Sequence, residues 1–292
     1  MSRILVTGAT GNLGGATIDR LLKAADPSSV VGLARDEAKA ARLRAKGVEA
    51  RLGDYENPDA LDAAMAGIDK VLLVSGRDQM QLLRQHENVI RAAQRAEVSH
   101  LVYTGTAVQD WEASPLRPML EGHFRTEDVL RESGVPFTVL RNSMYLDALP
   151  YFIGTNAFND GIRIPAGTGR TPFALRREMG EAAGNVLTQD GHVGKTYQLS
   201  AAKSYTFAEI AQALADTFDK PVAYEDIEPE RFTERLQQAG IPQGAAAGLT
   251  GFITDMRDGR YDIVTDDLTD LLGREPVGLK DAIGEVFPPE LP

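Results

Sequence analysis

The feature that most constrains this chain is a glycine-rich loop near its start, Thr7-Gly8-Ala9-Thr10-Gly11-Asn12-Leu13-Gly14-Gly15. An apolar run precedes the loop and an amphipathic segment follows it, which predicts a strand, a turn and a helix. At such a turn Gly8 permits the tight bend, Gly11 lets backbone N–H groups approach a pyrophosphate, and Gly14 lets the helix pack on the strand. The helix N-terminus would stabilise the phosphate charge. We expect a dinucleotide site; a glycine turn without a ligand is the alternative.

The rest of the first half alternates between short apolar runs and Ala-rich amphipathic segments. The apolar runs predict strands at Arg3–Thr7, Val30–Ala34, Glu49–Leu52, Lys70–Ser75, His100–Gly105 and Pro136–Arg141. The segments between them predict helices at Leu13–Ala24, Asp36–Lys46, Pro58–Ala66, Gln81–Ala96 and Gly122–Ser133. Continuously apolar strands joined by helices are typical of a parallel sheet covered on both faces. The predicted fold class is therefore α/β, with a Rossmann-type doubly wound parallel sheet.

After about residue 145 the alternation becomes irregular. Residues 146–172 are rich in Gly, Pro and aromatic residues, as a loop or lid would be, and helices are expected again at Arg177–Thr188, Phe207–Phe218 and Leu279–Val286. A strand is expected at Thr196–Leu199, and the Gly/Ala-rich stretch Gly244–Gly251 is expected to be mobile. We divide the chain into an NAD(P)-binding domain, residues 1–150, and a smaller C-terminal α/β substrate-covering domain, residues 151–292. Elements near residues 176–200 are expected to return to the first domain.

Composition limits the kinds of partner. The chain of 292 residues has a net charge of −11, which disfavours nucleic acid and anionic membrane as partners. It contains no cysteine, and its four histidines lack the spacing of paired metal ligands, so no metal site is predicted. No apolar run is long enough to span a membrane and the N-terminus does not resemble a signal peptide, which favours a cytoplasmic protein. The sequence is compatible with a homodimer and leaves the oligomeric state open.

The residue after the second strand indicates which dinucleotide is bound. Sites for NAD place an acidic residue there to bind the ribose 2′-OH, whereas an Arg accommodates the 2′-phosphate of NADP. Here the strand runs into Arg35, whose guanidinium can make paired contacts with a phosphate. The alternative is a surface ion pair between Arg35 and Asp36 or Glu37. We expect NADP(H) as the cofactor.

Other strand ends should border the same cofactor, because ligands lie outside the carboxyl ends of such strands. Asp54 and Tyr55 follow the third strand and are placed to line the adenine pocket, although Asp54 is equally placed to cap the next helix. Small residues after the fourth and fifth strands leave room for a flat nicotinamide ring. The predicted cofactor-binding residues are Thr7, Gly8, Thr10, Gly11, Asn12, Leu13, Gly14, Arg35, Asp54, Tyr55, Val74, Ser75, Gly76, Thr104, Arg141 and Asn142.

Several motifs carry a resemblance to a known family. They are Val-Thr-Gly-Ala-Thr-Gly-Asn-Leu-Gly at 6–14, Ala-Arg at 34–35, Gly-Asp-Tyr at 53–55, Leu-Leu-Val-Ser-Gly at 72–76, His-Glu-Asn-Val-Ile at 86–90, Tyr-Thr-Gly at 103–105, Ser-Pro-Leu at 114–116 and Leu-Arg-Asn at 140–142. His123 with Thr126-Glu127, Tyr145, Asp-Asp-Leu at 266–268 and Leu-Leu-Gly at 271–273 extend the likeness nearly end to end. The chain resembles the NmrA-like atypical short-chain dehydrogenase/reductases. Within them it is most similar to the quinone oxidoreductase type 2 and triphenylmethane dye reductase group.

The catalytic pair of standard short-chain dehydrogenases is missing. Those enzymes use a Tyr and a Lys four residues later, but none of the eight tyrosines here has Lys at that spacing. No lysine occurs between Lys70 and Lys195. Hydride transfer still works where the acceptor needs little proton help, as when a quinone becomes a phenolate, and catalysis is then mainly positioning. The predicted function is an NADPH-dependent quinone or aromatic reductase; the alternative is a non-catalytic NmrA-type NADP-binding redox sensor.

Three residues are candidates for the catalytic end of the site. His123 can titrate near neutrality, so we predict an auxiliary proton donor or a contact to the nicotinamide ribose; packing or capping at the start of its helix is the alternative. The resemblance implies that Arg141–Tyr145 contact the nicotinamide end, with Asn142 as the polar anchor. Tyr145 is placed to stack on a flat substrate or to join the core. Residues 109–118, which contain the single Trp111, are expected to form a flap over the substrate.

Overall fold

The computed structural model, described here for residues 2–76, 78–154 and 157–287, is built on one seven-stranded parallel sheet. The strand order is β3-β2-β1-β4-β5-β6-β8, and every neighbouring pair is parallel. The strands are β1 (Ile4–Val6), β2 (Val30–Ala34), β3 (Glu49–Leu52), β4 (Lys70–Leu73), β5 (His100–Thr106), β6 (Phe137–Asn142) and β8 (Thr196–Leu199). The order reverses between β1 and β4, which is the switch point at which such sheets bind ligands. The predicted Rossmann-type doubly wound sheet is confirmed.

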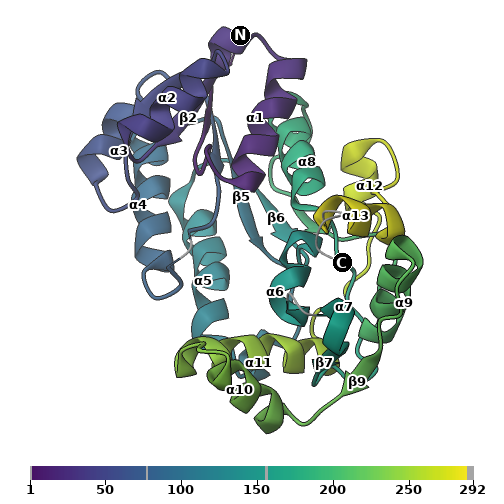
Figure 1. Cartoon of the computed structure of the whole chain (residues 1–292). Helices are drawn as coiled ribbons and strands as arrows, with labels where there is room; N and C mark the ends of the chain where they lie inside the picture. Colours follow the sequence, from purple (N-terminus) through teal and green to yellow (C-terminus); the bar gives the residue numbers. More distant parts are fainter. Residues whose placement is uncertain (1, 77, 155–156, 288–292) are drawn as a thin grey trace.

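Helices cover both faces of this sheet, because successive strand residues point to opposite sides. On one face Ile4, Val6 and Leu72 pack with α1 (Asn12–Ala24), α2 (Glu37–Ala45), α8 (Arg176–Thr188) and α12 (Asp267–Leu272). On the other face Leu5 and Val71 pack with α3 (Pro58–Met65), α4 (Leu82–Arg95) and α5 (Arg117–Ser133). Figure 1 shows α1 and α8 side by side on one side of the sheet and α3, α4 and α5 on the other. This sheet with its helices is called the large lobe below.

Helix α8 packs unusually close to α1. A Cβ atom added to Gly180 would lie 2.6 Å from the carbonyl oxygen of Leu13, a separation that only glycine permits. The hydroxyl of Thr17 donates to the carbonyl of Gly180 at 2.9 Å. Further along, Gly184 meets Arg20, so the two helices run side by side in the same direction. Three elements from the second half of the chain, α8, β8 and α12, therefore complete the large lobe.

A small lobe lies beyond the carboxyl ends of the strands (Figure 1). Its two-stranded parallel sheet consists of β7 (Ile162–Ile164) and β9 (Tyr224–Asp226). The surrounding helices are α6 (Leu149–Ile153), α7 (Ala157–Asp160), α9 (Phe207–Phe218), α10 (Pro229–Gln238), α11 (Gln243–Arg257) and α13 (Leu279–Val286). They share a separate apolar core, which includes Phe173, Phe207 and Tyr261. The segment 146–172, predicted as a loop or lid, supplies α6, α7 and β7 to this lobe.

Two predictions about local structure are wrong. The stretch Gly244–Gly251 was expected to be mobile but lies in α11, where Gly251 packs so closely on Leu116 that an added Cβ would lie 2.7 Å from it. Helix α5 begins at Arg117 and not at Gly122, because Pro118 lies in the first helical turn, where its missing N–H leaves no bond unmade. Short α12 was not predicted at all.

Within the described ranges, no helix combines the length and apolarity that crossing a membrane requires. The same ranges hold no group of three or more His, Asp or Glu side chains placed to bind a metal ion.

Candidate active site

The glycine loop joins β1 to α1 at the carboxyl end of the sheet. Gly8 adopts a φ of +58°, a left-handed conformation that glycine tolerates, and its carbonyl accepts the Gly11 N–H at 2.9 Å. A Cβ on Gly14 would lie 2.4 Å from that carbonyl oxygen, so this position admits only glycine without a backbone shift. The neighbouring Gly15 is less constrained, since its added Cβ would meet nothing closer than 3.8 Å. The loop is thus closed onto the first turn of α1.

The N-terminus of α1 presents backbone donors. The N-cap residue is Gly11, which has no side chain to accept a hydrogen bond from the first turn, and that turn holds no acidic residue. Thr10, Gly11 and Asn12 are exposed at the surface. The side chain of Leu13 is buried in the core, so only its backbone faces the loop surface. Unpaired N–H groups and the positive end of the helix dipole make this turn suited to an anion.

Thr7 and Tyr55 use their polar atoms inside the protein. The Thr7 hydroxyl accepts the Val74 N–H at 2.9 Å, and the Tyr55 hydroxyl donates to the Val74 carbonyl at 2.8 Å while it contacts Thr7. Burial raises the pKa of Tyr55, so its hydroxyl stays protonated. These bonds tie the ends of β1 and β4 together. Both residues therefore shape the site through the backbone they hold.

Arg35 lies at the carboxyl end of β2 and is exposed. Its two candidate surface partners are already engaged: Asp36 caps α2 and pairs with Lys39 at 2.9 Å, and Glu37 pairs with Arg44. No ion pair is recorded for Arg35 within residues 2–76, 78–154 and 157–287. The predicted alternative, a pair with Asp36 or Glu37, is wrong.

Asp54 follows β3 and is half-buried. Its carboxylate accepts the Glu56 N–H at 2.9 Å, a local turn contact. The N-cap of α3 is instead Asn57, whose side chain accepts the Ala60 N–H at 3.1 Å. The alternative role of Asp54 as the cap of that helix is therefore wrong.

The ends of β4 and β5 are held by side chains. The Ser75 N–H donates to the hydroxyl of buried Thr104 at 3.0 Å, so Thr104 fixes the turn that carries Ser75. The Gly76 N–H donates to Nε2 of His86 in α4 at 3.2 Å. Sequence reasoning did not single out His86. The only sign of it was its place in a motif of the family, since its partner is a backbone group ten residues earlier.

His123 lies inside α5, well past the first turn. Its Nδ1 atom is 2.9 Å from the hydroxyl of Tyr103, a fully buried residue of β5. Burial lowers the pKa of His123 to about 4, so the ring is neutral at pH 7. The prediction rested on titration near neutrality, and that premise is wrong. Capping at the start of the helix is also wrong, because α5 begins at Arg117.

Arg141 is held by a buried carboxylate. Its Nε and Nη2 atoms donate to the two oxygens of Glu127 at 2.8 and 2.7 Å. The Glu127 side chain is 2% exposed, so it needs this cationic partner. Arg141 was predicted to bind the cofactor, but its guanidinium is committed to Glu127. We therefore do not retain it as a cofactor contact.

Asn142 and Tyr145 lie together where β6 ends. The Asn142 side-chain amide donates to the Tyr145 hydroxyl at 3.0 Å, and its Oδ1 atom is buried without a hydrogen-bond partner among the described residues. The guanidinium of Arg176 lies over the Tyr145 ring at 4.3 Å. Such a stack fixes the ring by a cation–π contact. Burial raises the pKa of Tyr145.

Arg176 was missed by sequence reasoning. It is the first residue of α8, and its backbone N–H donates to Asp147 at 2.8 Å. Because Gly180 lies beside Leu13 and the two helices run in the same direction, Arg176, one turn earlier, lies level with the glycine loop. An isolated Arg late in the chain carries no sequence signal for this place.

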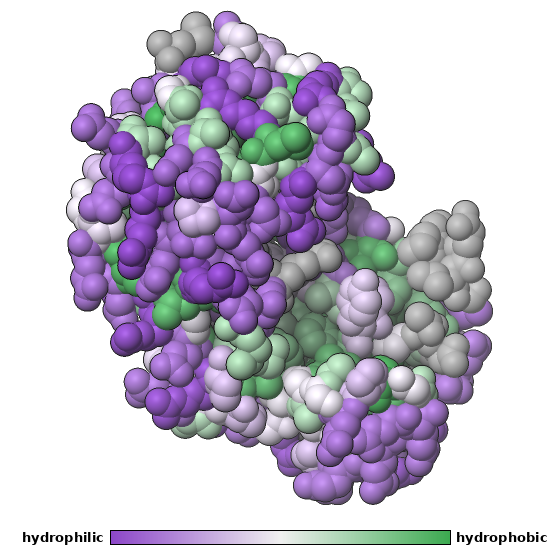
Figure 2. All heavy atoms as spheres, turned by 90° about the vertical axis from the view of Figure 1, so that its left-hand side faces the viewer, coloured by the Kyte–Doolittle hydropathy of each residue, from purple (hydrophilic) through white to green (hydrophobic). Residues whose placement is uncertain are grey.

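The predicted flap is anchored to the small lobe. The Gln109 N–H donates to the Arg260 carbonyl at 2.9 Å, and Ser114 donates to the buried Asp255 at 2.5 Å. Trp111 stacks on Phe124 with ring centroids 4.7 Å apart. These contacts hold residues 109–118 against the small lobe and against α5. Figure 2 shows the hollow between the two lobes, with hydrophobic residues at its base.

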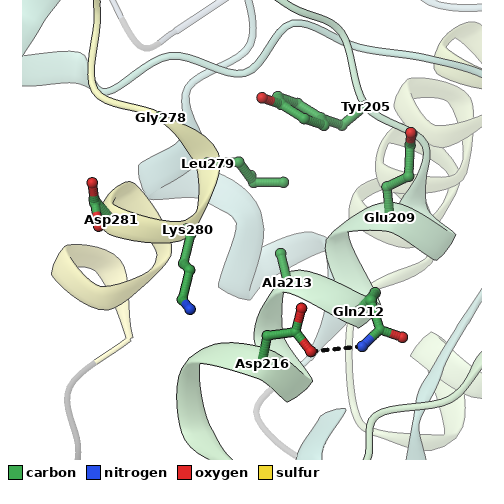
Figure 3. Close-up of a pocket in the computed structure, with 9 residues that line it drawn as sticks. All are labelled: Tyr205, Glu209, Gln212, Ala213, Asp216, Gly278, Leu279, Lys280 and Asp281. Atoms are coloured by element: carbon green, nitrogen blue, oxygen red, sulfur yellow. Dashed lines mark hydrogen bonds between the residues drawn. The ribbon is translucent and has the colours of Figure 1, made fainter.

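A second hollow lies away from these residues, between α9 and α13 (Figure 3). It has a volume of about 430 Å³, and Tyr205, Glu209, Asp216 and Lys280 are among its lining residues. Glu209 is already paired with Arg170, and Asp216 accepts a hydrogen bond from Gln212. None of the residues predicted from the sequence lines this groove.

Comparison with known proteins shows similarity along almost the whole chain. Residues 8–158 match a family described as NAD(P)H-binding. The chain is 33% identical over 286 residues to quinone oxidoreductase 2 of Escherichia coli (strain K12), covering 97% of this chain and 98% of that protein. It is 31% identical over 251 residues to an NAD(P)H azoreductase of Xenophilus azovorans, covering 84% of each. The structure of Citrobacter sp. triphenylmethane reductase complexed with NADP(H) is similar, with a TM-score of 0.89 and 35% identity over 98% of this chain and 100% of that one.

Proposed function

Because this chain belongs to the NAD(P)H-binding family and, within it, to the NmrA-like atypical short-chain dehydrogenase/reductases, we propose that it is an NADPH-dependent reductase that transfers hydride to a quinone or similar electrophilic aromatic molecule. The membership confirms the resemblance found in the sequence. The chain is an NAD(P)H-dependent oxidoreductase, with NADP(H) as its cofactor. The acceptor and the roles of single residues are the proposal.

The main support for the proposal is the set of anion-binding groups at the carboxyl end of the sheet. The first turn of α1 offers backbone donors to a pyrophosphate, and exposed Arg35 offers a guanidinium to a 2′-phosphate. No Tyr with a Lys four residues later is present to move a proton. The site therefore suits hydride transfer to an acceptor whose reduced form is already stabilised.

We assign the nicotinamide end to Asn142, Tyr145 and Arg176. The unpartnered Oδ1 atom of Asn142 is an acceptor suited to a carboxamide or ribose hydroxyl, because a buried oxygen without a partner is costly. Arg176, level with the glycine loop and half-buried, suits a phosphate or the nicotinamide ribose. The proposed cofactor contacts are the backbone from Gly8 to Gly14, the turn from Val74 to Gly76, and the side chains of Arg35, Asp54, Asn142 and Arg176, with Tyr145 held between the last two.

The test is an acceptor screen with both reduced cofactors. We expect NADPH oxidation with quinones, with a lower KM for NADPH than for NADH. Unchanged NADPH absorbance across a panel of quinones and dyes would contradict the proposal. In that case equal affinity for the reduced and oxidised cofactor would favour the redox-sensor reading.

A further inference from the structure

A buried polar cluster lies beneath the ends of β4 and β5. It joins His86 of α4, Tyr103 of β5, and His123 and Thr126 of α5. The rings of His86 and Tyr103 meet edge to face, with centroids 5.2 Å apart. The proposed function above assigns no role to any of these four side chains. The hydrogen bonds of the others decide where the ring hydrogen of His123 lies.

The hydrogen positions around His86 are fixed by its backbone partner. The Gly76 N–H donates to Nε2 at 3.2 Å, so Nε2 carries no hydrogen and the hydrogen lies on Nδ1. That Nδ1–H donates to the Thr126 hydroxyl at 2.9 Å. The Thr126 hydroxyl in turn donates to the Gly122 carbonyl at 2.7 Å. His86 is neutral in this arrangement, and burial lowers its pKa to about 3.

The same reasoning applies to Tyr103 and His123. Tyr103 is fully buried and burial raises its pKa, so its hydroxyl keeps its proton and needs an acceptor. The Nδ1 atom of His123 is 2.9 Å away. The hydroxyls of Thr126 and Ser75 also lie near the phenol. The Thr126 oxygen already accepts from His86 and uses its own hydrogen on Gly122, so His123 Nδ1 is the nitrogen acceptor that faces the Tyr103 hydroxyl. If Tyr103 donates to Nδ1, the single ring hydrogen of neutral His123 lies on Nε2.

We propose that Tyr103 is a positioning residue that holds His123 as the neutral Nε2–H tautomer, so that His123 donates a hydrogen bond to the carbonyl oxygen of the acceptor and does not transfer a proton. The inference rests on the proposed function for the identity of the acceptor. Hydride transfer from the nicotinamide converts a quinone to its hydroquinone monoanion and leaves the cofactor oxidised. The Nε2–H stabilises the oxygen on which that charge develops, and water supplies the proton afterwards.

A neutral donor suits this environment. A ring whose pKa is about 4 holds no extra proton to give at pH 7, and loss of its remaining N–H would create a buried anion. A neutral imidazole can still polarise a carbonyl, because a preorganised N–H acts without being transferred. By donating its hydrogen to Nδ1, Tyr103 disfavours the other tautomer, in which the hydrogen lies on Nδ1 and Nε2 offers only a lone pair.

The first test reads the tautomer directly and needs no substrate. Long-range ¹H–¹⁵N correlation spectra of the cofactor-bound protein report which ring nitrogen of each histidine carries hydrogen, and His123→Gln assigns the His123 signals. We expect Nε2–H for His123 and Nδ1–H for His86 in the wild type. In Tyr103→Phe the His123 ring should shift toward Nδ1–H. An Nδ1–H ring at His123 in the wild type, or a ring unaffected by Tyr103→Phe, would overturn the proposal.

The second test compares acceptors. A cationic triarylmethyl dye develops no negative oxygen when it accepts hydride, whereas a quinone does. Tyr103→Phe should lower kcat with a quinone about tenfold and lower kcat with the dye much less. The matched control is Tyr197→Phe, which removes a similar hydroxyl, 2.8 Å from His192 Nδ1 and remote from the site; it should change neither rate.

Equal loss with both acceptors would overturn the role of Tyr103 in polarising the acceptor. Failure of the wild type to reduce either acceptor would contradict the proposed function, and the tautomer measurement would still decide the Tyr103–His123 bond. Thermal unfolding of Tyr103→Phe checks that the phenyl ring keeps the core intact, since only the hydroxyl is removed.

Discussion

The two ends of the parallel sheet contain similar side-chain pairs that do different work. At the carboxyl end Tyr103 contacts His123 at 2.9 Å, and at the amino end Tyr197 contacts His192 at 2.8 Å. At the amino end the surrounding groups bond to backbone: Lys70 donates to a carbonyl at the end of α8 at 2.8 Å. The His192–Tyr197 contact joins two residues only five positions apart, across the loop that leads into β8. A tyrosine–histidine contact alone therefore does not identify a binding site.

What lies beyond the pair makes the difference. At the carboxyl end the strands lead into the glycine turn, an uncapped helix N-terminus and the hollow between the lobes. The tyrosine–histidine bond there lies at the same end of the sheet as these features. Variants that change one end and leave the other intact can break or sharpen this comparison.

The largest effect is expected on the free energy of unfolding, when an ion pair at one end of the sheet is broken. Glu127→Gln should lower the free energy of unfolding by about 3 kcal/mol, because it leaves Arg141 without its buried partner. Glu49→Gln, which affects the exposed pair with Arg3 at the amino end, should cost less than about 1 kcal/mol. Urea unfolding measures both. Equal losses would show that burial does not distinguish the two ends.

The next effect concerns the glycine turn. Gly14→Ala places a methyl group 2.4 Å from the Gly8 carbonyl, and the backbone shift should weaken NADPH binding by about tenfold to a hundredfold. Gly15→Ala is the matched control, since its methyl group meets nothing closer than 3.8 Å, and it should bind nearly as the wild type does. Titration of the cofactor fluorescence measures the Kd. A loss shared by both variants would indicate a general effect of alanine in this turn.

A smaller and more selective effect is expected at Arg35. Arg35→Ala should weaken NADPH binding about tenfold, because a charged hydrogen bond to the 2′-phosphate is lost, and should leave NADH binding nearly unchanged. Arg3→Ala removes a cation at the amino end of the same sheet and should change neither Kd. Calorimetric titration with both cofactors measures the difference. Equal weakening for NADPH and NADH would refute the 2′-phosphate role.

The smallest difference between the ends is expected in acid. Burial lowers the pKa of His86 to about 3 and that of His100 to about 4, below the value near 6.5 of an unfolded chain. Below pH 6.5 the unfolded chain binds more protons, so the stabilisation is full above that pH and is lost as pH falls toward the folded values. His86→Asn and His100→Asn should each reduce the slope of stability against pH between 6.5 and 5 by about 1 kcal/mol per unit. Urea midpoints across that range measure the slope; a slope that stays the same in both variants would contradict the shifts.

Much of the large lobe could be predicted because its strands are buried on both faces. Val30–Ala34 is apolar throughout and ends at Arg35, so both its position and its charged terminus are visible in the sequence. Helix α11 was missed because its glycines weaken the helical pattern. The close contact of Gly251 with Leu116, which needs a glycine, joins residues distant in sequence.

The site was predictable where a function depends on local sequence. The glycine turn and Arg35 are read from consecutive residues, whereas Arg176 and Tyr103 gain their place from packing. Arg176 reaches the glycine loop only because α8 lies against α1, and Tyr103 meets His123 across the space between a strand and a helix. Arg141 was misassigned because its partner Glu127 comes from another element.

The packing of α8 on α1 bears on how the protein forms during translation. Gly180 contacts residues near the start of the chain, and β8 pairs with β6 only after residue 199 has been made. The ribosome must therefore synthesise about two thirds of the polypeptide before the first helix has its neighbour. Until then the nascent chain exposes apolar surface that the finished lobe buries, which is the condition under which chaperones act. A truncated product ending near residue 150 should be insoluble, however complete its glycine loop.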